Sequence, residues 1–137
     1  MAITIRPAGV HDLPSVRRLL TLMRDASSEI SWSTTTWSQI LADPNRTVLL
    51  ALDLEEHAVA TADLLIVPNL THDGAPWGIV ENVVVDRAWR HRGVGKALMH
   101  HAVRTAEAAG CHKVQLASST KPARRASRGP RSKKPDR

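Results

Sequence analysis

The sequence predicts an α/β fold in which a β-sheet is flanked by helices. Strand-like apolar stretches and stretches of helical spacing follow one another in the order β-α-α-β-β-β-α-β. An apolar run at residues 79–85 leads through a glycine-containing turn into an apolar-periodic segment at residues 94–109, which predicts a strand–turn–helix unit. A chain of 137 residues with 42% hydrophobic residues fits one domain with its own core.

The first elements are a short strand and a helix. Residues 3–6 alternate apolar and polar side chains until Pro7, which predicts a strand. Asp12 is a good N-cap and Pro14 is tolerated in a first turn, so a helix is expected over about residues 13–25. Its apolar positions recur at helical spacing: Val16, Leu19, Leu20 and Met23.

A second, shorter helix is expected before the middle of the chain. Residues 27–36 are polar and rich in Ser and Thr, which predicts a loop. Trp37, Ile40 and Leu41 then have helical spacing. Since proline cannot continue a helix, this one should end before Pro44.

The middle of the chain predicts a hairpin followed by a long loop. Residues 47–52 and 57–67 are apolar runs with strand composition, and residues 53–56 between them have the composition of a turn. Residues 69–78 contain Asp-Gly and Pro and should form a loop.

The last predicted elements are strand, loop, helix and strand. The strand covers residues 79–85, the loop residues 86–92, and the helix about residues 94–109. Gly110 is expected to end the helix in the left-handed conformation. Residues 113–118 predict a final strand.

The turn at residues 90–96 has the chemistry of a phosphate site. Gly93 and Gly95 allow the backbone to approach a bulky anion. The first N–H groups of the following helix lack internal partners and carry partial positive charge. Arg90, Arg92 and Lys96 add full charges around them.

Two common phosphate motifs do not fit this turn. A Walker loop needs Ser or Thr after the Gly-Lys pair, but Ala97 follows Lys96. A dinucleotide fingerprint needs a third glycine where Leu98 stands.

Residues 90–95, read Arg-His-Arg-Gly-Val-Gly, match the pattern Arg/Gln-x-x-Gly-x-Gly/Ala. This pattern and its flanks, Glu-Asn-Val-Val-Val-Asp at residues 81–86 and Ala-Leu-Met at 97–99, resemble the GNAT superfamily of acetyl-CoA-dependent N-acetyltransferases. The resemblance covers about residues 1–120. It implies a mixed central sheet flanked by helices that splays open at the cofactor. It also implies transfer of an acetyl group from acetyl-CoA to a primary amine by direct attack in a ternary complex. The strand at residues 79–85, together with residues 110–114, is similar to amino-sugar phosphate acetyltransferases in particular.

The resemblance implies roles for individual residues. The backbone of Val83, Val84 and Val85, on a bulged strand, would bind the pantetheine arm, and a free N–H there would polarise the thioester carbonyl. The pyrophosphate loop would consist of Arg90, His91, Arg92, Gly93, Val94, Gly95 and Lys96. Glu81 would be the base that takes a proton from the amine, often through water. Alternatively, Glu81 is a solvated or ion-paired strand residue, and the valines also fill the core.

In this family the acceptor pocket is formed by the loop between the first two helices and by the loop before the bulged strand. Those loops carry candidate substrate-binding residues in this chain: Glu29, Trp32 and Trp77, with Trp37, His72 and Asp73 nearby. Acids and Trp suit a cationic amine. Packing of the three Trp side chains in the core or at its rim is the alternative.

The chain departs from the family pattern after Thr120. It contains no Tyr and no Phe, so the tyrosine that protonates the departing thiolate in many members is absent, as are the final family helix and strands. Residues 121–137 hold eight Lys or Arg and one acid, whereas residues 1–120 hold 11 bases and 12 acids. We therefore expect a GNAT domain at 1–120 and a basic, disordered tail at 121–137, produced by truncation or an altered reading frame.

Three function classes compete, and we expect the first. The first is a working acetyltransferase, the second an acetyl-CoA-binding remnant without turnover, and the third a protein that binds nucleic acid non-specifically through its tail. His100 and His101 lie inside the predicted helix with no third ligand at metal spacing, so no metal is expected. No signal peptide or membrane span is recognisable, which predicts a cytoplasmic protein. An exposed edge at residues 113–118 would invite a homodimer.

Overall fold

The computed structural model describes residues 2–23 and 33–117. The sheet has five strands in the order β1-β2-β3-β4-β5. The first four pair antiparallel, and β5 runs parallel to β4, so the sheet is mixed, as the resemblance implied. The strands are β1 (Thr4–Pro7), β2 (Arg46–Leu52), β3 (Ala58–Val67), β4 (Trp77–Val85) and β5 (Val114–Leu116).

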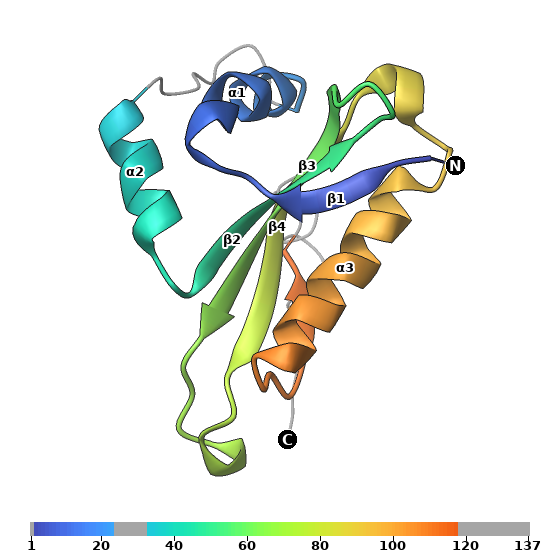
Figure 1. Cartoon of the computed structure of the whole chain (residues 1–137). Coiled ribbons are helices and arrows are strands. Elements are labelled where there is room, and N and C mark those ends of the chain that lie inside the picture. Colours follow the sequence, from blue (N-terminus) through green and yellow to red (C-terminus); the bar gives the residue numbers. More distant parts are fainter. Residues whose placement is uncertain (1, 24–32, 118–137) are drawn as a thin grey trace, which may run out of the picture.

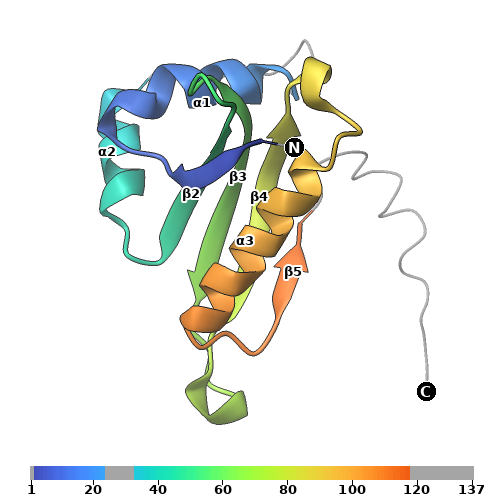
Figure 2. The ribbon, with the colours of Figure 1, turned by 45° about the vertical axis from the view of Figure 1, so that its right-hand side comes forward.

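Helices cover both faces of this sheet (Figures 1 and 2). Helices α1 (Leu13–Thr21) and α2 (Thr34–Ala42) lie on one face, and α3 (Val94–Ala108) lies on the other. Three short 3₁₀ turns occur at Val10–Asp12, His72–Gly74 and Arg87–Trp89. The α/β fold class expected from the sequence is therefore confirmed, and no described helix has the length and apolar character that a membrane crossing requires.

The core consists of two clusters separated by the sheet. On the α3 side, Leu98 and Val94 are fully buried against Leu49, Leu64 and Val80 of the strands. On the α1 and α2 side, Leu19 and Trp37 pack on alternate strand residues, among them Val48, Leu50 and Val84. Because side chains alternate along a strand, the continuous apolar runs of β2 and β3 supply both clusters.

Several element boundaries differ from the sequence-based expectations. Helix α1 ends at Thr21, where the Leu22 N–H donates to the Leu19 carbonyl, so the prediction of a helix to residue 25 was too long. Helix α2 already begins at Thr34, inside the predicted loop. The reason is local: the Ser33 hydroxyl accepts a hydrogen bond from the Thr36 N–H at 3.0 Å and caps the helix.

Asp12 does not cap α1 with its side chain, as the sequence had suggested. Its carboxylate instead accepts hydrogen bonds from the Gly9 N–H at 2.7 Å and from the Arg6 guanidinium at 2.7 Å. Asp12 ends the 3₁₀ turn that precedes α1, and its carboxylate points toward residues earlier in the chain, away from the first turn of α1. These contacts, the one with Arg6 first, hold the pKa of Asp12 below its usual range.

The end of the sheet near α3 is partly open. Strand β5 pairs with β4 only between Gly78 and Val80, so no described strand pairs with that side of β4 beyond Val80. Among the described strands, β5 pairs with β4 alone and forms an edge of the sheet. Leu116 in β5 is 58% exposed. A homodimer through this edge remains a prediction.

Candidate active site

A groove of about 570 Å³ lies where the open end of β4 meets the start of α3. It brings together two segments that the sequence had assigned to one cofactor site. From the strand come Val83, Val84 and Val85, and Met23 closes the groove from the end of α1. The loop and helix contribute Trp89, Arg90, His91, Gly93, Val94, Gly95 and Lys96.

The loop reaches the helix through two left-handed residues. His91 has a φ of 62° and Gly93 a φ of 86°. Gly93 occupies the N-cap position of α3, where no side chain caps the helix. The N–H groups of Val94, Gly95 and Lys96 therefore begin the helix without side-chain caps, which is the arrangement that an anion needs.

The strand side of the groove offers free backbone as well. A β-bulge interrupts the pairing of β3 with β4 between Thr61 and Asp63, and Asn82 lies in it with a φ of 55°. The residues that follow, Val83 to Val85, lie beyond the stretch where β5 pairs. An extended ligand can therefore add to this edge in the way that a further strand would.

The charged residues of the loop differ in what they contact. The Arg90 Nε donates to the Val85 carbonyl at 3.0 Å, which ties the loop to the end of β4. The Arg92 guanidinium lies 4.4 Å from the centre of the Trp89 ring and donates to the Ala88 carbonyl at 3.3 Å. Arg92 is therefore the one predicted cofactor residue that does not line the groove.

Asp86 fixes the loop where it leaves β4. Its carboxylate accepts from the Ala88 N–H at 3.1 Å and from the Arg18 guanidinium of α1 at 3.1 Å. The hydrogen bond from Ala88, followed by the one from Arg18, lowers the pKa of Asp86 below its usual value. Arg18 also donates to the Ala58 carbonyl at 2.6 Å, so α1, β3 and the loop are joined at one point.

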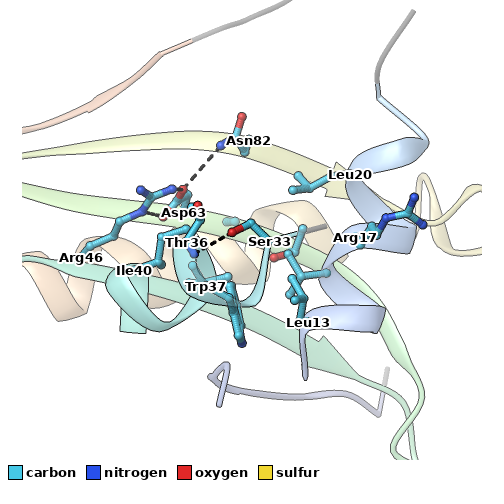
Figure 3. Close-up of a pocket in the computed structure, with 14 residues that line it drawn as sticks. Leu13, Arg17, Leu20, Ser33, Thr36, Trp37, Ile40, Arg46, Asp63 and Asn82 are labelled. Carbon is cyan, nitrogen blue, oxygen red and sulfur yellow. Dashed lines mark hydrogen bonds and ion pairs between the residues drawn. The ribbon is translucent and has the colours of Figure 1, made fainter. Parts of the chain in front are cut away.

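A second cavity, of about 270 Å³, lies on the other face of the sheet (Figure 3). Its walls are α1, α2 and the middle of β2, β3 and β4. Most of the exposed wall surface is apolar, and seven of the 14 lining residues are apolar: Leu13, Val16, Leu20, Trp37, Ile40, Val48 and Ala62. Asn82 lines this cavity while the next residue, Val83, lines the groove, so both spaces border the bulge in β4.

One polar cluster stands at the sheet side of the cavity. Asp63 is 4% exposed, and the Arg46 Nε donates to its Oδ1 at 3.0 Å while an Arg46 Nη2 binds its other oxygen. The Asn82 amide reaches the same carboxylate at 3.4 Å (Figure 3). The contact with Asp63 is the main cause that raises the pKa of Arg46, and Asp43 and Glu81 add to it.

Glu81 lies beside this cluster. It is the cross-strand neighbour of Asp63 and precedes the bulge, so its side chain belongs to the face that α1 and α2 cover. It is half-buried and lines neither the groove nor the cavity. The predicted base is thus two residues from Val83 and next to a carboxylate–guanidinium pair.

Of the three residues predicted to bind the acceptor, the structure describes Trp77 alone, so their grouping stays a prediction. Glu29 and Trp32 lie outside the described residues. Trp77 begins β4, six residues and roughly 20 Å of strand from Val83. The Lys113 ammonium lies 5.0 Å from the centre of the Trp77 ring. The stacked rings of His72 and His112 line the same small pocket as Trp77.

Some residues of the site escaped the sequence analysis. Asp63 stood inside an apolar run and could have been noticed as a lone carboxylate in a strand that is otherwise buried. Asn82 interrupts a valine run, and Asn tolerates the left-handed conformation. Among the described residues, no group of three or more His, Cys, Asp or Glu is placed to hold a metal ion.

Comparison with known proteins identifies relatives of this chain. The model of the Acetyltransferase (GNAT) family matches residues 13–128. A "putative acetyltransferase" of Agrobacterium tumefaciens str. C58 is 35% identical, with a TM-score of 0.78 over 98% of this chain and 97% of that chain. The glucosamine-6-phosphate N-acetyltransferase structure from Arabidopsis thaliana is 19% identical with a TM-score of 0.76, covering 100% and 96% of the two chains, which is a likeness of fold.

One curated relative aligns over the part of the chain with the strongest motifs. The "Glucosamine 6-phosphate N-acetyltransferase" of Trypanosoma brucei brucei is 43% identical over 63 residues, which are 46% of this chain and 43% of that protein. The chain thus matches less than half the length of this relative. The glucosamine 6-phosphate in this name is the substrate of the relative.

Proposed function

Because the chain belongs to the GNAT acetyltransferase family, we propose that it moves an acetyl group from acetyl-CoA to a primary amine of a small molecule. The observation that carries the proposal is that the groove and the cavity are lined by adjacent residues of the same bulge, Val83 and Asn82. The groove at Val83–Val85 suits the cofactor, and the cavity at Asn82 suits the acceptor. Direct transfer in a ternary complex needs both molecules within reach of the same strand.

The groove supports the assignment of a cofactor site because its backbone and side-chain groups fit acetyl-CoA. The uncapped start of α3 offers N–H groups to the pyrophosphate, and Arg90 and Lys96 add positive charge. The open edge of β4 offers backbone groups to the pantetheine arm. Acetyl-CoA would supply the acetyl thioester, and a backbone N–H after the bulge would be the donor to its carbonyl oxygen.

Glu81 is the proposed base. An alkylammonium has a pKa near 10, about that of a lysine side chain, so the acceptor must lose a proton before it reacts. Glu81 lies on the cavity face of β4, next to the bulge. A carboxylate there would accept the proton through water and pass it to solvent, since Glu81 is half-buried and not enclosed.

A second candidate function is a chain that holds acetyl-CoA without turnover. The specific observation in its favour is the complete absence of Tyr from the sequence, which removes the usual proton donor of the departing thiolate. A free thiol has a pKa of about 8.5, so water can also protonate this leaving group. We therefore place the working enzyme first.

Acceptor-dependent release of CoA thiol tests the proposal. Wild type should release thiol only when both acetyl-CoA and an amine are present, and the names of the curated relatives make glucosamine 6-phosphate one amine to include. Glu81→Gln should lower kcat by about 10²-fold or more, with binding of acetyl-CoA unchanged. Binding of acetyl-CoA without release of thiol for any amine would favour the second function.

A further inference from the structure

We propose that the acceptor is an amine with an apolar body, an aryl-alkyl or alkyl amine, and not a sugar phosphate. This inference rests on the proposed acetyl transfer and names the substrate class of the same site. It comes from the composition of the cavity between α1, α2 and the sheet (Figure 3).

The shape and lining of the cavity favour an apolar ligand. Leu13, Val16 and Leu20 lie on successive turns of α1. Trp37 and Ile40 face them from α2. Figure 3 shows Leu13 and Leu20 on one side and Ile40 on the other, with Trp37 below. A ligand body that removes these side chains from water gains free energy in proportion to the apolar area buried.

Several polar groups in the cavity wall already have partners. The Thr61 hydroxyl donates to the Leu49 carbonyl at 2.9 Å, and the Ser33 hydroxyl accepts from the Thr36 N–H at 3.0 Å. Each hydroxyl of a sugar that enters such a space gives up its hydrogen bonds to water, and Thr61, Arg46 and Asp63 of the wall already have partners within the protein. A polyhydroxylated acceptor is therefore disfavoured by the described walls.

The charges beside the bulge suit an ammonium group. Asp63 and Glu81 carry two negative charges against the one positive charge of Arg46, and the Asp43 carboxylate, which like Glu81 does not line the cavity, interacts electrostatically with the same guanidinium. The net charge at the sheet side is negative, next to Asn82, where the amine must arrive. Arg17 stands at the α1 wall, away from Asp63 (Figure 3), and is the one described cation at that side of the cavity.

A comparison of two acceptors tests the inference on the full 137-residue chain. We expect kcat/KM for 2-phenylethylamine to exceed that for glucosamine 6-phosphate at least tenfold. The reverse order would overturn the inference and leave the acetyltransferase proposal intact. A phosphate arm that contacts Arg17 would produce that reverse order.

Paired variants show whether the cavity is responsible for the preference. Leu20→Ala removes three carbons from the cavity wall, so the ratio of kcat/KM for 4-phenylbutylamine over 2-phenylethylamine should rise about fivefold or more. Leu41→Ala makes the same change on α2 at a residue that packs in the same core cluster without lining the cavity, and should leave the ratio unchanged. Equal ratios in the two variants would contradict the inference.

Binding without turnover separates this inference from the proposed function. Calorimetry on the chain saturated with CoA measures each amine directly. If 2-phenylethylamine binds and glucosamine 6-phosphate does not, the inference holds even where no thiol is released and the proposed function fails. If glucosamine 6-phosphate binds more tightly, or if neither amine binds, the inference is wrong.

Discussion

Asn82 interrupts a run of valines and lies where β4 changes its pairing with β3. Its φ of 55° is one that a β-branched residue rarely adopts, because Cβ then crowds the following carbonyl. Its side chain reaches Asp63, so one residue both shapes the bulge and joins it to the polar cluster. Asn82 therefore suits the bulge both in its backbone conformation and in its side-chain contact.

Substitution of Asn82 should separate backbone conformation from side-chain contact. Asn82→Val is expected to lower the free energy of unfolding by about 1–2 kcal/mol through left-handed strain. Asn82→Gly keeps the conformation and loses only the contact with Asp63, so its loss should be smaller. Urea unfolding measures both, and equal losses would show that strain at this residue is not the dominant cost.

Gly95 should matter for the ligand and not for the fold. A Cβ at Gly95 would meet only Val85 Cγ2, at 3.7 Å, so Gly95→Ala fits and should gain up to about 1 kcal/mol of helix stability. Because the methyl group projects from the first turn beside the groove, we expect acetyl-CoA affinity to fall about tenfold, or about 1.4 kcal/mol. Thermal unfolding and calorimetry measure the two effects.

Gly110→Ala is the matched control. Gly110 ends α3 with a φ of 88° and has no atom within 4 Å of a built Cβ, so alanine there is strained without blocking anything. It should lose about 1–2 kcal/mol of stability and keep its acetyl-CoA affinity. Weakened acetyl-CoA binding by Gly110→Ala, or undiminished binding by Gly95→Ala, would contradict the assignment of the groove.

Among the elements, the unit of β4, loop and α3 was the most predictable from sequence. Val83 to Val85, Gly93 and Gly110 each have one simple structural reason, namely strand propensity or a left-handed turn. The start of α2 was not predictable in the same way, since Ser33 caps it from within a run of similar Ser and Thr residues. Any of several neighbours could have formed that cap.

The loop should also depend on pH through Asp86. Its folded-state pKa lies below the value of about 3.9 expected in the unfolded chain, so its contribution to stability is present above that value. The contribution is lost as pH falls through the lower, folded-state pKa. Asp86→Asn should therefore lower stability by up to about 1 kcal/mol at neutral pH.

The same difference should vanish in acid. At pH values below the folded-state pKa of Asp86, wild type and Asp86→Asn are expected to unfold at similar urea concentrations, because both side chains are then uncharged. Glu107→Gln, an exposed carboxylate on α3, serves as the control and should match wild type throughout. A difference between Asp86→Asn and wild type that persists unchanged in acid would mean that charge is not the cause.

At the level of the whole molecule, the groove and the cavity are formed by different helices packed on the sheet. Helix α3 and the loop form the groove on one side, and α1 and α2 enclose the cavity on the other. The sequence predicted most of the groove, because all of its lining residues except Met23 lie within the stretch 83–96. It did not predict the cavity, because Leu13, Trp37, Asp63 and Asn82 meet only after the sheet has formed. Sequence spacing cannot report such contacts between distant segments.

We propose that residues 1–120 carry the acetyltransferase function and that residues 121–137 carry any affinity for nucleic acid. Deleting residues 121–137 removes eight basic residues and one acid. The deletion should abolish binding to a DNA duplex at low salt and leave acetyl-CoA affinity within about twofold. Retained DNA binding would place that affinity in the domain.

Calorimetric titration of acetyl-CoA into the complete 137-residue chain tests the groove most directly. We predict saturable binding of one acetyl-CoA per chain, held by the uncapped start of α3 and the open edge of β4. A sample that is folded by circular dichroism and takes up no acetyl-CoA would contradict the proposal that this chain is an acetyltransferase at all.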